Sequence, residues 1–392
     1  MNLLYVCKSL PHRFQGGIQS HVWKLSEWMI RRGHNITILT AGSLRRGERR
    51  YELEGRQVVE LPYLPGRKLP FVSLWGEEWA FNRAADKWLL RYAADFDIVH
   101  AQGRSGFLFA GKQGETPLIT TIHGLVSVEN AQSGRTGAAS NWATRQHEIW
   151  ATMFEKNAMH NSNHIIAVSE PLLEHMKNLV PTIENKTAII PNGIDIPQNT
   201  ENTEGSVEDA KQLLFVGRLD PIKGIFPLIE AMKRVNSDVH LVMVGEGPSR
   251  GELEKRIAEN GLQHRVALVG AQSAAQVQGW MSASLALVLP SFYESLPMVI
   301  MEANSCGKPV IASDTGGIPT LVQHGKNGWL VPVNQPSILA RAIDELFDNP
   351  KRARLMGETG RQIMHDNFSW AHVAHLTDEI YQTARSQQLA FQ

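Results

Sequence analysis

The sequence predicts an α/β protein of two doubly wound domains in tandem, each with a parallel sheet covered by helices on both faces. Three observations lead to this prediction: the length, a regular alternation of strand-like and helix-like segments, and a polar break near the middle. The chain has 392 residues, and since a domain usually has roughly 100 to 200, two domains are expected. Hydrophobic residues make up 43 % and charged residues 20 %, which excludes a disordered chain.

Short runs rich in Val, Ile and Leu are the expected strands of the first domain. They lie at residues 3–7, 36–40, 98–101, 118–122, 165–168 and 188–190. The segments between them are longer and carry helical patterns. Strands that alternate with helices are typical of a parallel sheet in which helices cross from one strand to the next.

A polar segment at residues 198–209, with hardly an apolar side chain, interrupts this alternation, and we interpret it as a surface loop between the domains. Strand-like runs resume at residues 213–216, 239–244, 266–269, 285–289 and 309–312. We therefore assign residues 1–197 to an N-terminal domain and residues 198–371 to a C-terminal one. A stretch of small residues at 129–141 predicts a mobile loop over a cleft.

Charge and cysteine usage narrow the classes of function. Basic and acidic residues number 39 each, which argues against a dedicated nucleic-acid binder. Residues 1–200 hold 22 basic and 18 acidic residues, against 17 and 21 in the remainder. This asymmetry indicates either a first half that meets anionic matter or drift without function. The distant Cys7 and Cys306 predict reduced thiols in a cytosolic protein, and no apolar run reaches the ~20 residues of a membrane span or the core of a signal peptide.

Candidate ligand-binding residues follow the predicted strands, because ligands of such sheets bind outside the carboxyl ends of the strands. Glu294 and Glu302 lie eight positions apart about the start of a helix, with Pro297 expected in its first turn. The free N–H groups of Leu296, Met298 and Val299 then form a positive helix terminus suited to a phosphate. The alternative is a solvated pair of carboxylates on a surface helix.

A second cluster follows the strand at residues 213–216. Gly217 ends the strand, Arg218 lies beside it and Lys223 precedes the next helix. Since Arg grips two phosphate oxygens and Lys supplies a point charge, the two cations could neutralise a diphosphate leaving group. The alternative is an Arg218 paired with a structural carboxylate.

In the first domain, Gly16 and Gly17 stand immediately before a helix, where paired glycines permit positive φ and close approach of the backbone to a ligand. His123 ends another strand and faces the same cleft, with a purely structural histidine as the alternative. The pairs Asp95/Asp97 and His160/His164 lack the context of metal motifs. No metal site is therefore assigned.

With these residues in view, the chain resembles the family 4 retaining glycosyltransferases of the GT-B fold, in which two Rossmann-like domains face each other across a cleft. The resemblance spans essentially the whole length. It rests on the order and spacing of short segments at residues 16–17, 121–123, 167–170, 191–195, 217–218, 223–224, 244–248, 294–302 and 316–319.

The resemblance implies transfer of a hexosyl group from a nucleotide-diphospho-sugar donor, such as a UDP- or GDP-sugar, to a hydroxyl acceptor. The acceptor would be a glycan, a lipid-linked sugar or a small molecule, and no metal or other cofactor would be needed. Donor binding is expected in the C-terminal domain and acceptor binding in the N-terminal one. The alternatives are an epimerase or phosphorylase of the same fold, or a binding module without catalysis.

Roles for the candidate residues follow from the same resemblance. Arg218 and Lys223 would hold the diphosphate, Glu302 the ribose and Glu294 the hydroxyls of the donor sugar. Amides of Gly17, Met298 and Val299 would complete the phosphate cradle, His123 would lie beside the donor sugar, and the backbone near Gln272 would face the base. Many relatives have an acidic residue after the histidine, whereas this chain has Gly124.

Two helices carry further expectations. An amphipathic helix from about residue 370 is expected to cross back onto the N-terminal domain, so residues 372–392 are assigned to it. A helix over residues 75–92 would present Arg83, Lys87 and Arg91 on one face, beside Trp75 and Trp79, with Arg45, Arg46, Arg49 and Arg50 extending the patch. One interpretation is that this face docks the protein reversibly on the inner face of the cytoplasmic membrane, where it would glycosylate a lipid-linked or membrane-proximal acceptor in cell-envelope polysaccharide synthesis. The alternative is that the cations are merely solvated and the tryptophans belong to the core or to the acceptor pocket.

Overall fold

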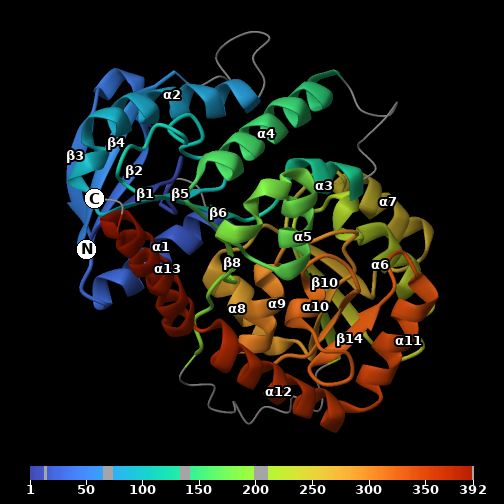
Figure 1. Cartoon of the computed structure of the whole chain (residues 1–392). Coiled ribbons are helices and arrows are strands. Elements are labelled where there is room, and N and C mark those ends of the chain that lie inside the picture. The colour runs from blue at the N-terminus through green and yellow to red at the C-terminus, as the bar shows by residue number, and fades with distance from the viewer. Residues whose placement is uncertain (13–15, 65–73, 133–141, 198–210, 391–392) are drawn as a thin grey trace. The chain divides into compact units, whose positions relative to one another are not determined.

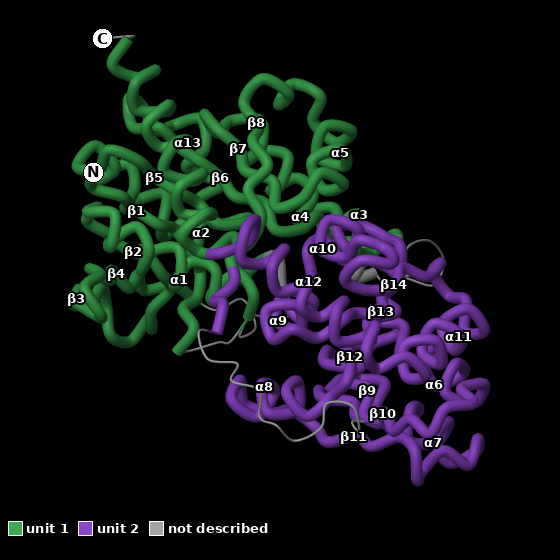
Figure 2. Tube along the Cα trace, turned by 90° about the horizontal axis from the view of Figure 1, so that it is seen from below, with its two compact units in different colours: residues 1–193, 370–392 green, residues 194–369 purple. Residues whose placement is uncertain are grey.

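The computed structural model describes residues 1–12, 16–64, 74–132, 142–197 and 211–390 (Figure 1). The chain divides into two compact units: unit 1 comprises residues 1–193 and 370–392, and unit 2 comprises residues 194–369 (Figure 2). These divisions lie two to four positions before the boundaries expected from the sequence. The reason is local, because Ile194 pairs with Ser369 in a parallel bridge within unit 2.

Unit 1 contains an eight-stranded sheet with the order β3-β4-β2-β1-β5-β6-β7-β8. Its strands are β1 (Asn2–Val6), β2 (Asn35–Ser43), β3 (Arg49–Leu53), β4 (Arg56–Tyr63), β5 (Ile98–Gln102), β6 (Leu118–Ile122), β7 (His164–Ala167) and β8 (Thr187–Ile189). All pairs are parallel except β3 with β4. The six strands expected in this half are therefore present.

The hairpin of β3 and β4 was not predicted. Its edge strand begins with Arg49 and Arg50, charged residues that hide a strand signal but suit an unpaired edge. Glu54 and Gly55 connect the two strands, both with positive φ (49° and 75°). Positive φ at both central positions is typical of the tight hairpin turn that matches strand twist.

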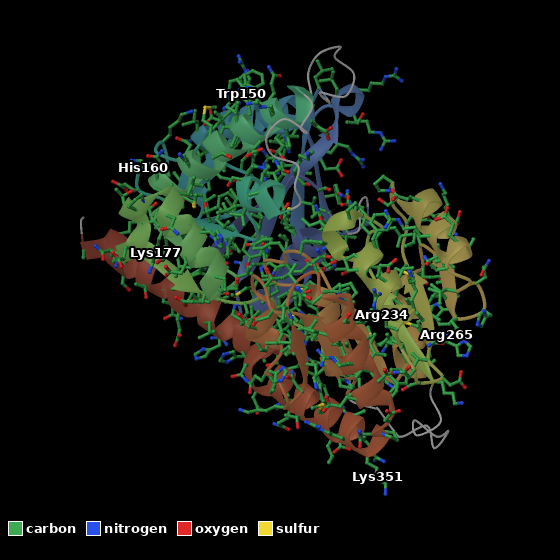
Figure 3. The ribbon with its side chains drawn as sticks, turned by 90° about the vertical axis from the view of Figure 1, so that its right-hand side faces the viewer. Trp150, His160, Lys177, Arg234, Arg265 and Lys351 are labelled. Atoms are coloured by element: carbon green, nitrogen blue, oxygen red, sulfur yellow. The ribbon has the colours of Figure 1, made fainter. Side chains whose placement is uncertain are left out.

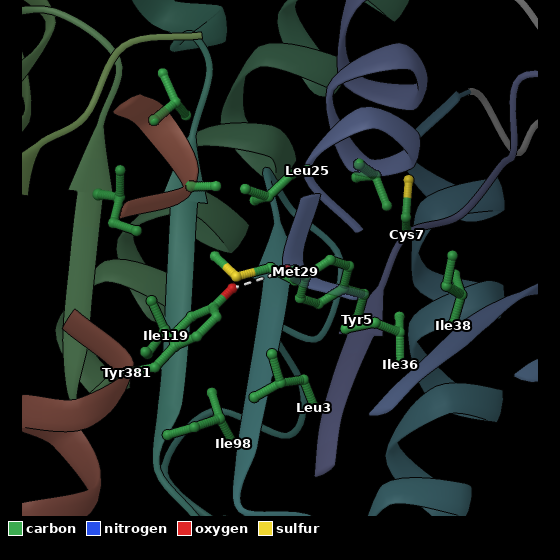
Figure 4. Packing of buried hydrophobic residues seen from close by; sticks show 14 of the residues in the cluster. Leu3, Tyr5, Cys7, Leu25, Met29, Ile36, Ile38, Ile98, Ile119 and Tyr381 are labelled. Atoms are coloured by element: carbon green, nitrogen blue, oxygen red, sulfur yellow. Dashed lines mark hydrogen bonds between the residues drawn. The ribbon is translucent and has the colours of Figure 1, made fainter. Parts of the chain in front are cut away.

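Helices cover both faces of the unit 1 sheet: α1 (Gly17–Arg31), α2 (Leu74–Tyr92), α3 (Val126–Gln132), α4 (Trp142–Asn161), α5 (Glu170–Leu179) and α13 (Trp370–Ala390). Alternate residues of β1 point to opposite faces, as the pleat requires. Leu3 and Tyr5 pack with residues of α1 and α13 (Figure 4), whereas Leu4 and Val6 pack with residues of α2. The last helix is thus part of the unit 1 core.

Unit 2 contains a fully parallel six-stranded sheet with the order β11-β10-β9-β12-β13-β14. Its strands are β9 (Gln212–Val216), β10 (His240–Val244), β11 (Val266–Gly270), β12 (Ala286–Leu289), β13 (Val310–Ser313) and β14 (Gly328–Val331). The five strands expected here are present, and only the short β14 was not predicted. The strand order reverses between β9 and β12, which is where ligands of doubly wound sheets bind.

The helices of unit 2 are α6 (Ile225–Met232), α7 (Arg250–Glu259), α8 (Ala274–Ala283), α9 (Met298–Ser305), α10 (Ile318–Leu321), α11 (Pro336–Phe347) and α12 (Pro350–Phe368). Arg265 fastens the loop between α6 and β10, since its guanidinium donates to the carbonyls of Val235 (3.3 Å) and Ser237 (3.1 Å) (Figure 3). This anchor lies at the amino ends of the strands and leaves the opposite edge for ligands.

Candidate active site

An ion pair joins the loops that follow β9 and β12 at the switch point of unit 2. Nζ of Lys223 lies 2.6 Å from Oε1 of Glu294, and Oγ of Ser291 donates to the same oxygen at 2.8 Å. The N–H of Phe292 also donates to the carbonyl of Ile222 at 2.7 Å. The side chains keep 27 % and 12 % of their surface exposed, so a ligand can reach both.

Two glycines fix the backbone under this pair. Gly224 has φ +67°, and a Cβ there would overlap the carbonyl oxygen of Pro290. Gly316 has φ +51°, and a Cβ there would overlap the carbonyl oxygen of Glu294. Gly317 then donates its N–H to that same carbonyl at 2.8 Å. Because side chains rarely adopt positive φ and here lack space, glycine is required at both positions.

Arg218 is paired with a carboxylate, as the structural alternative expected. Its Nη2 lies 2.5 Å from Oδ2 of the buried Asp220, whose Oδ1 accepts from the N–H of Ile222 at 3.2 Å. The Arg218 side chain is nevertheless 58 % exposed. Since a guanidinium carries five N–H donors, one ion pair leaves donors directed to solvent. The ion pair therefore orients the Arg218 side chain and leaves N–H donors of its guanidinium available to a ligand.

The first turn of α9 begins one residue later than expected. Pro297 is the extended N-cap residue (φ −75°, ψ 113°) and not part of the first turn, so Leu296 lies outside the helix. Met298 and Val299 supply the first two helical N–H groups. No acidic residue lies in that turn, and the helix terminus keeps its positive character toward an anion.

Glu302 lies one turn into α9. Burial raises the pKa of its carboxyl above the usual range. Among the described residues no cation forms an ion pair with it, in contrast to Glu294. A carboxylate without a counterion is a ready acceptor for ligand hydroxyl groups.

The two remaining candidates of unit 2 lie at strand ends. The N–H of Gly217 donates to the carbonyl of Val244 at 3.0 Å, which joins the ends of β9 and β10. Gln272 follows β11, and its Nε2 donates to the carbonyl of Val269 at 2.9 Å. This hydrogen bond holds the Gln272 side chain against the end of its own strand.

Unit 1 contains a cavity of about 600 Å³ at the carboxyl ends of its strands. It is lined by residues at or just after the carboxyl ends of β1, β2, β5 and β6, together with residues of α2 and α4. His123 is one of these lining residues. The volume lies within the roughly 300 to 1,000 Å³ of small-molecule sites.

A chain of hydrogen bonds orients His123 in this cavity. Its Nε2 lies 2.9 Å from Oε1 of Gln102, and Nε2 of Gln102 lies 3.2 Å from Nε2 of His100. His100 in turn bonds Tyr381 of α13 at 2.6 Å. Burial lowers the pKa of His123 to about 4 and that of His100 to about 3. Both rings are therefore neutral at pH 7, and His123 carries its proton on Nε2 because an amide oxygen only accepts.

The paired glycines are placed differently from the expectation. Gly16 caps α1 with an extended backbone (φ −161°), and Gly17 is the first helical residue. Neither has positive φ among the residues that the structure describes. The conformational freedom of glycine is not used here because the chain enters α1 directly. What the position offers is space, since a Cβ at Gly17 would meet nothing within 4 Å.

Sequence reasoning missed a charged cluster in the unit 1 cavity. Arg104 bonds both oxygens of Glu78 at 2.7 Å, through Nε and Nη2, and its Nη1 lies 2.9 Å from Oε1 of Glu155. Lys8 lies 3.6 Å from Glu77 in the same cavity. One signal was present: Gly103 and Arg104 end β5 as Gly217 and Arg218 end β9.

The loop predicted at residues 129–141 is partly helical. Residues 129–132 belong to α3, which begins directly after the buried Leu125. Residues 133–141 lie outside the described part of the chain, and so does the predicted interdomain loop at 198–209. Within that part no group of three or more His, Cys, Asp or Glu residues is placed to hold a metal ion. No described helix is both long and apolar enough to span a membrane.

The predicted basic face is exposed on α2. Arg83, Lys87 and Arg91 lie on the surface, and the Arg83 guanidinium lies 5.1 Å from the ring of Trp79, which is 38 % exposed. The side chain of Trp75 is outside the described residues. Phe81, Ala85 and Trp88 are buried on the opposite face.

Two family models match the chain in succession. Residues 15–198 match Glycosyltransferase Family 4, and residues 198–363 match Glycosyl transferases group 1. An uncharacterized glycosyltransferase of Methanocaldococcus jannaschii is 27 % identical over 98 % of this chain and 98 % of its own length. Another from that organism is 31 % identical over 73 % of this chain and 75 % of its own length.

Solved structures resemble the whole chain. Sucrose-phosphate synthase from Thermosynechococcus elongatus has a TM-score of 0.81 at 23 % identity and covers 98 % of this chain and 99 % of its own. Anabaena HepE in complex with UDP-glucose has a TM-score of 0.72 at 19 % identity and covers 98 % and 100 %. At these identities the likeness shows the fold.

Proposed function

The chain belongs to the glycosyl transferases group 1 family and has the GT-B fold, and from this premise we propose that it transfers a sugar from a nucleotide-diphospho-sugar to a hydroxyl acceptor. We propose further that transfer retains the anomeric configuration and needs no metal ion or other cofactor. The observation that carries the proposal is the Lys223–Glu294 ion pair at the switch point of unit 2. It places a cation and a carboxylate where a ligand of this sheet would bind.

The donor binds in unit 2. Lys223 and Arg218 hold the diphosphate together with the amides of Met298 and Val299, and the backbone of Gly217 and Gln272 faces the nucleoside. Glu302 accepts the two ribose hydroxyls. The absence of an ion-pair partner for Glu302 among the described residues supports this role. Glu294 accepts hydroxyls of the donor sugar. The solved complexes of HepE with UDP-glucose support a donor of this class.

The chemical step is an exchange of bonds at the anomeric carbon. The acceptor oxygen attacks from the side on which the nucleoside diphosphate departs, so that the configuration is retained. The bond from the anomeric carbon to phosphate oxygen breaks, and the proton of the acceptor hydroxyl passes to that oxygen. Arg218 and Lys223 stabilise the negative charge that develops on the departing diphosphate.

Unit 1 binds the acceptor in its cavity. His123 takes part as a neutral ring held by Gln102, and the open surface at Gly16 and Gly17 admits a ligand close to the start of α1. An exposed cationic face on α2, with Trp79 beside Arg83, supports contact with an anionic membrane surface. We therefore propose a cytoplasmic enzyme that docks peripherally and serves cell-envelope polysaccharide synthesis.

A panel of UDP-, GDP- and ADP-sugars, each with a mixture of sugar acceptors, tests the proposal. Mass spectrometry would follow release of nucleoside diphosphate and gain of one sugar by the acceptor. We expect one donor to be consumed equally in the presence and absence of EDTA. Activity that returns only when Mg²⁺ or Mn²⁺ is added would contradict the metal-free step, and consumption of no donor would contradict the transfer itself.

A further inference from the structure

The charged groups in the unit 1 cavity are already paired with each other. Arg104 uses Nε, Nη1 and Nη2 on the carboxylates of Glu78 and Glu155, with distances of 2.7 to 2.9 Å. Lys8 is held near Glu77 at 3.6 Å. Two cations therefore face three carboxyl groups, and each nitrogen of the Arg104 guanidinium already donates to a carboxylate.

One oxygen in this cluster lacks a partner. Glu155 projects from α4 and is 1 % exposed, and its Oε1 accepts from Arg104 and from the N–H of Val126 at 3.2 Å. Its Oε2 is buried without a hydrogen-bond partner among the described residues. Leaving such an oxygen buried and unsatisfied is unfavourable, because it has lost its hydrogen bonds to water. A ligand hydroxyl in the cavity that Glu155 lines would satisfy it.

Most of the other polar groups that line the cavity also suit hydroxyl ligands better than anionic ones. Glu77 and Glu78 accept hydrogen bonds, Gln19 and Asn82 are amides, and His123 is a neutral ring. Burial raises the pKa of Glu155 to about 7, yet even its protonated form leaves two carboxylates against two cations. In neither state does the cavity carry an excess of positive charge.

We infer that the unit 1 cavity selects an uncharged polyhydroxylated acceptor, one of whose hydroxyls donates to Oε2 of Glu155, and that it disfavours acceptors phosphorylated at that end. The inference rests on the proposed function and names the chemical class of its acceptor. A phosphate would have to compete with the carboxylates of Glu78 and Glu155 for Arg104 and would lie beside their negative charge. A sugar hydroxyl can reach Oε2 of Glu155 once the atoms that cover this oxygen move, and the Arg104 ion pairs can stay in place.

Binding of free sugars to the full chain tests the inference apart from catalysis. The probes are glucose, mannose, galactose and N-acetylglucosamine and the 6-phosphate of each, followed by saturation-transfer NMR. We expect at least one neutral sugar to bind at least tenfold more tightly than its phosphate. Equal or tighter binding of the phosphates, or no binding by any neutral sugar, would overturn the inference.

Two variants on α4 sharpen the test. Glu155→Gln removes a carboxylate from Arg104, so we expect weaker binding of the neutral sugar and a narrower gap to its phosphate, each by about tenfold. Glu148→Gln makes the same change on the same helix outside the cavity lining and should alter neither value. Identical behaviour of the two folded variants would overturn the role of Glu155. Titration of the full chain with UDP, GDP and ADP reports on unit 2 separately. If none of these nucleotides binds, the result counts against the proposed function and not against this inference.

Discussion

Lys223 and Glu294 lie 71 positions apart in the chain, yet Nζ of one is 2.6 Å from Oε1 of the other. The parallel pairing of β9 with β12 brings their loops together. Because each group is partly exposed, the pair can exchange part of its mutual attraction for contacts with a ligand. It is the feature of unit 2 most directly suited to an anionic sugar donor.

Removal of either partner should abolish transfer with little effect on folding. We expect Lys223→Ala and Glu294→Gln each to lower kcat/KM by about a hundredfold or more, because both act on the donor in the transition state. Steady-state kinetics measure the loss, and circular dichroism checks the fold. The control is Lys233→Ala, which removes an exposed ion-pair partner of Glu230 at the carboxyl end of α6. Turnover near that of the control in either folded variant would refute the assignment.

Glycine at position 224 should be required for stability. We expect Gly224→Ala to lower the free energy of unfolding by more than the roughly 1 to 2 kcal/mol that positive φ alone costs an alanine, because its Cβ would also overlap the carbonyl of Pro290. Gly261→Ala is the matched control, since Gly261 has φ +65° and nothing within 4 Å of an added Cβ. Urea unfolding compares the two, and equal destabilisation would show that the close approach is unimportant.

The partly buried His123 of unit 1 should make the free energy of unfolding depend on pH in the acid range. His123 has its pKa lowered by burial from 6.5 to about 4, so the unfolded chain takes up a proton that the folded chain refuses. The stabilising contribution is therefore full above pH 6.5 and is lost as pH falls through about 4, by on the order of 3 kcal/mol. Urea unfolding of wild type and His123→Gln across this range should show the variant gaining relative stability as pH falls. A difference independent of pH would contradict a neutral His123 with a lowered pKa.

The basic face of α2 should mediate binding to anionic vesicles. We expect wild type to co-sediment with anionic and not with neutral vesicles at low salt, where attraction is least screened, and Arg83→Glu/Lys87→Glu/Arg91→Glu to lose this binding. Lys351→Glu/Arg352→Glu/Arg354→Glu, a triple change of exposed cations on α12, is the control. Negligible binding of wild type to both kinds of vesicle would leave a soluble acceptor as the better interpretation.

Secondary structure could be predicted from the sequence wherever a short local pattern of residues determines it. Apolar runs such as Leu3 to Val6 identify buried parallel strands, since both faces of those strands are covered. The edge strand starting at Arg49 could not be recognised in this way, because one side of an edge strand meets solvent and its charges resemble those of a loop.

Side chains that act together from distant segments were harder to predict. Arg218 and Lys223 are five positions apart and were found as one motif. Arg104 and Glu155 are 51 positions apart on a strand end and a helix, and only the packing of α4 in unit 1 brings them together. The start of α9 was displaced by one residue because Pro297 fits an N-cap as well as a first turn.

Calorimetric titration of nucleotides tests the central claim, that unit 2 is a nucleotide-diphospho-sugar site built on Arg218 and Lys223. UDP, GDP and ADP, each with its monophosphate, would be titrated into wild type and into Arg218→Ala/Lys223→Ala. We predict that at least one diphosphate binds wild type at least tenfold more tightly than its monophosphate, and that the double variant loses this advantage. Diphosphates that bind no better than their monophosphates, or that bind the folded double variant as tightly as wild type, would contradict the claim.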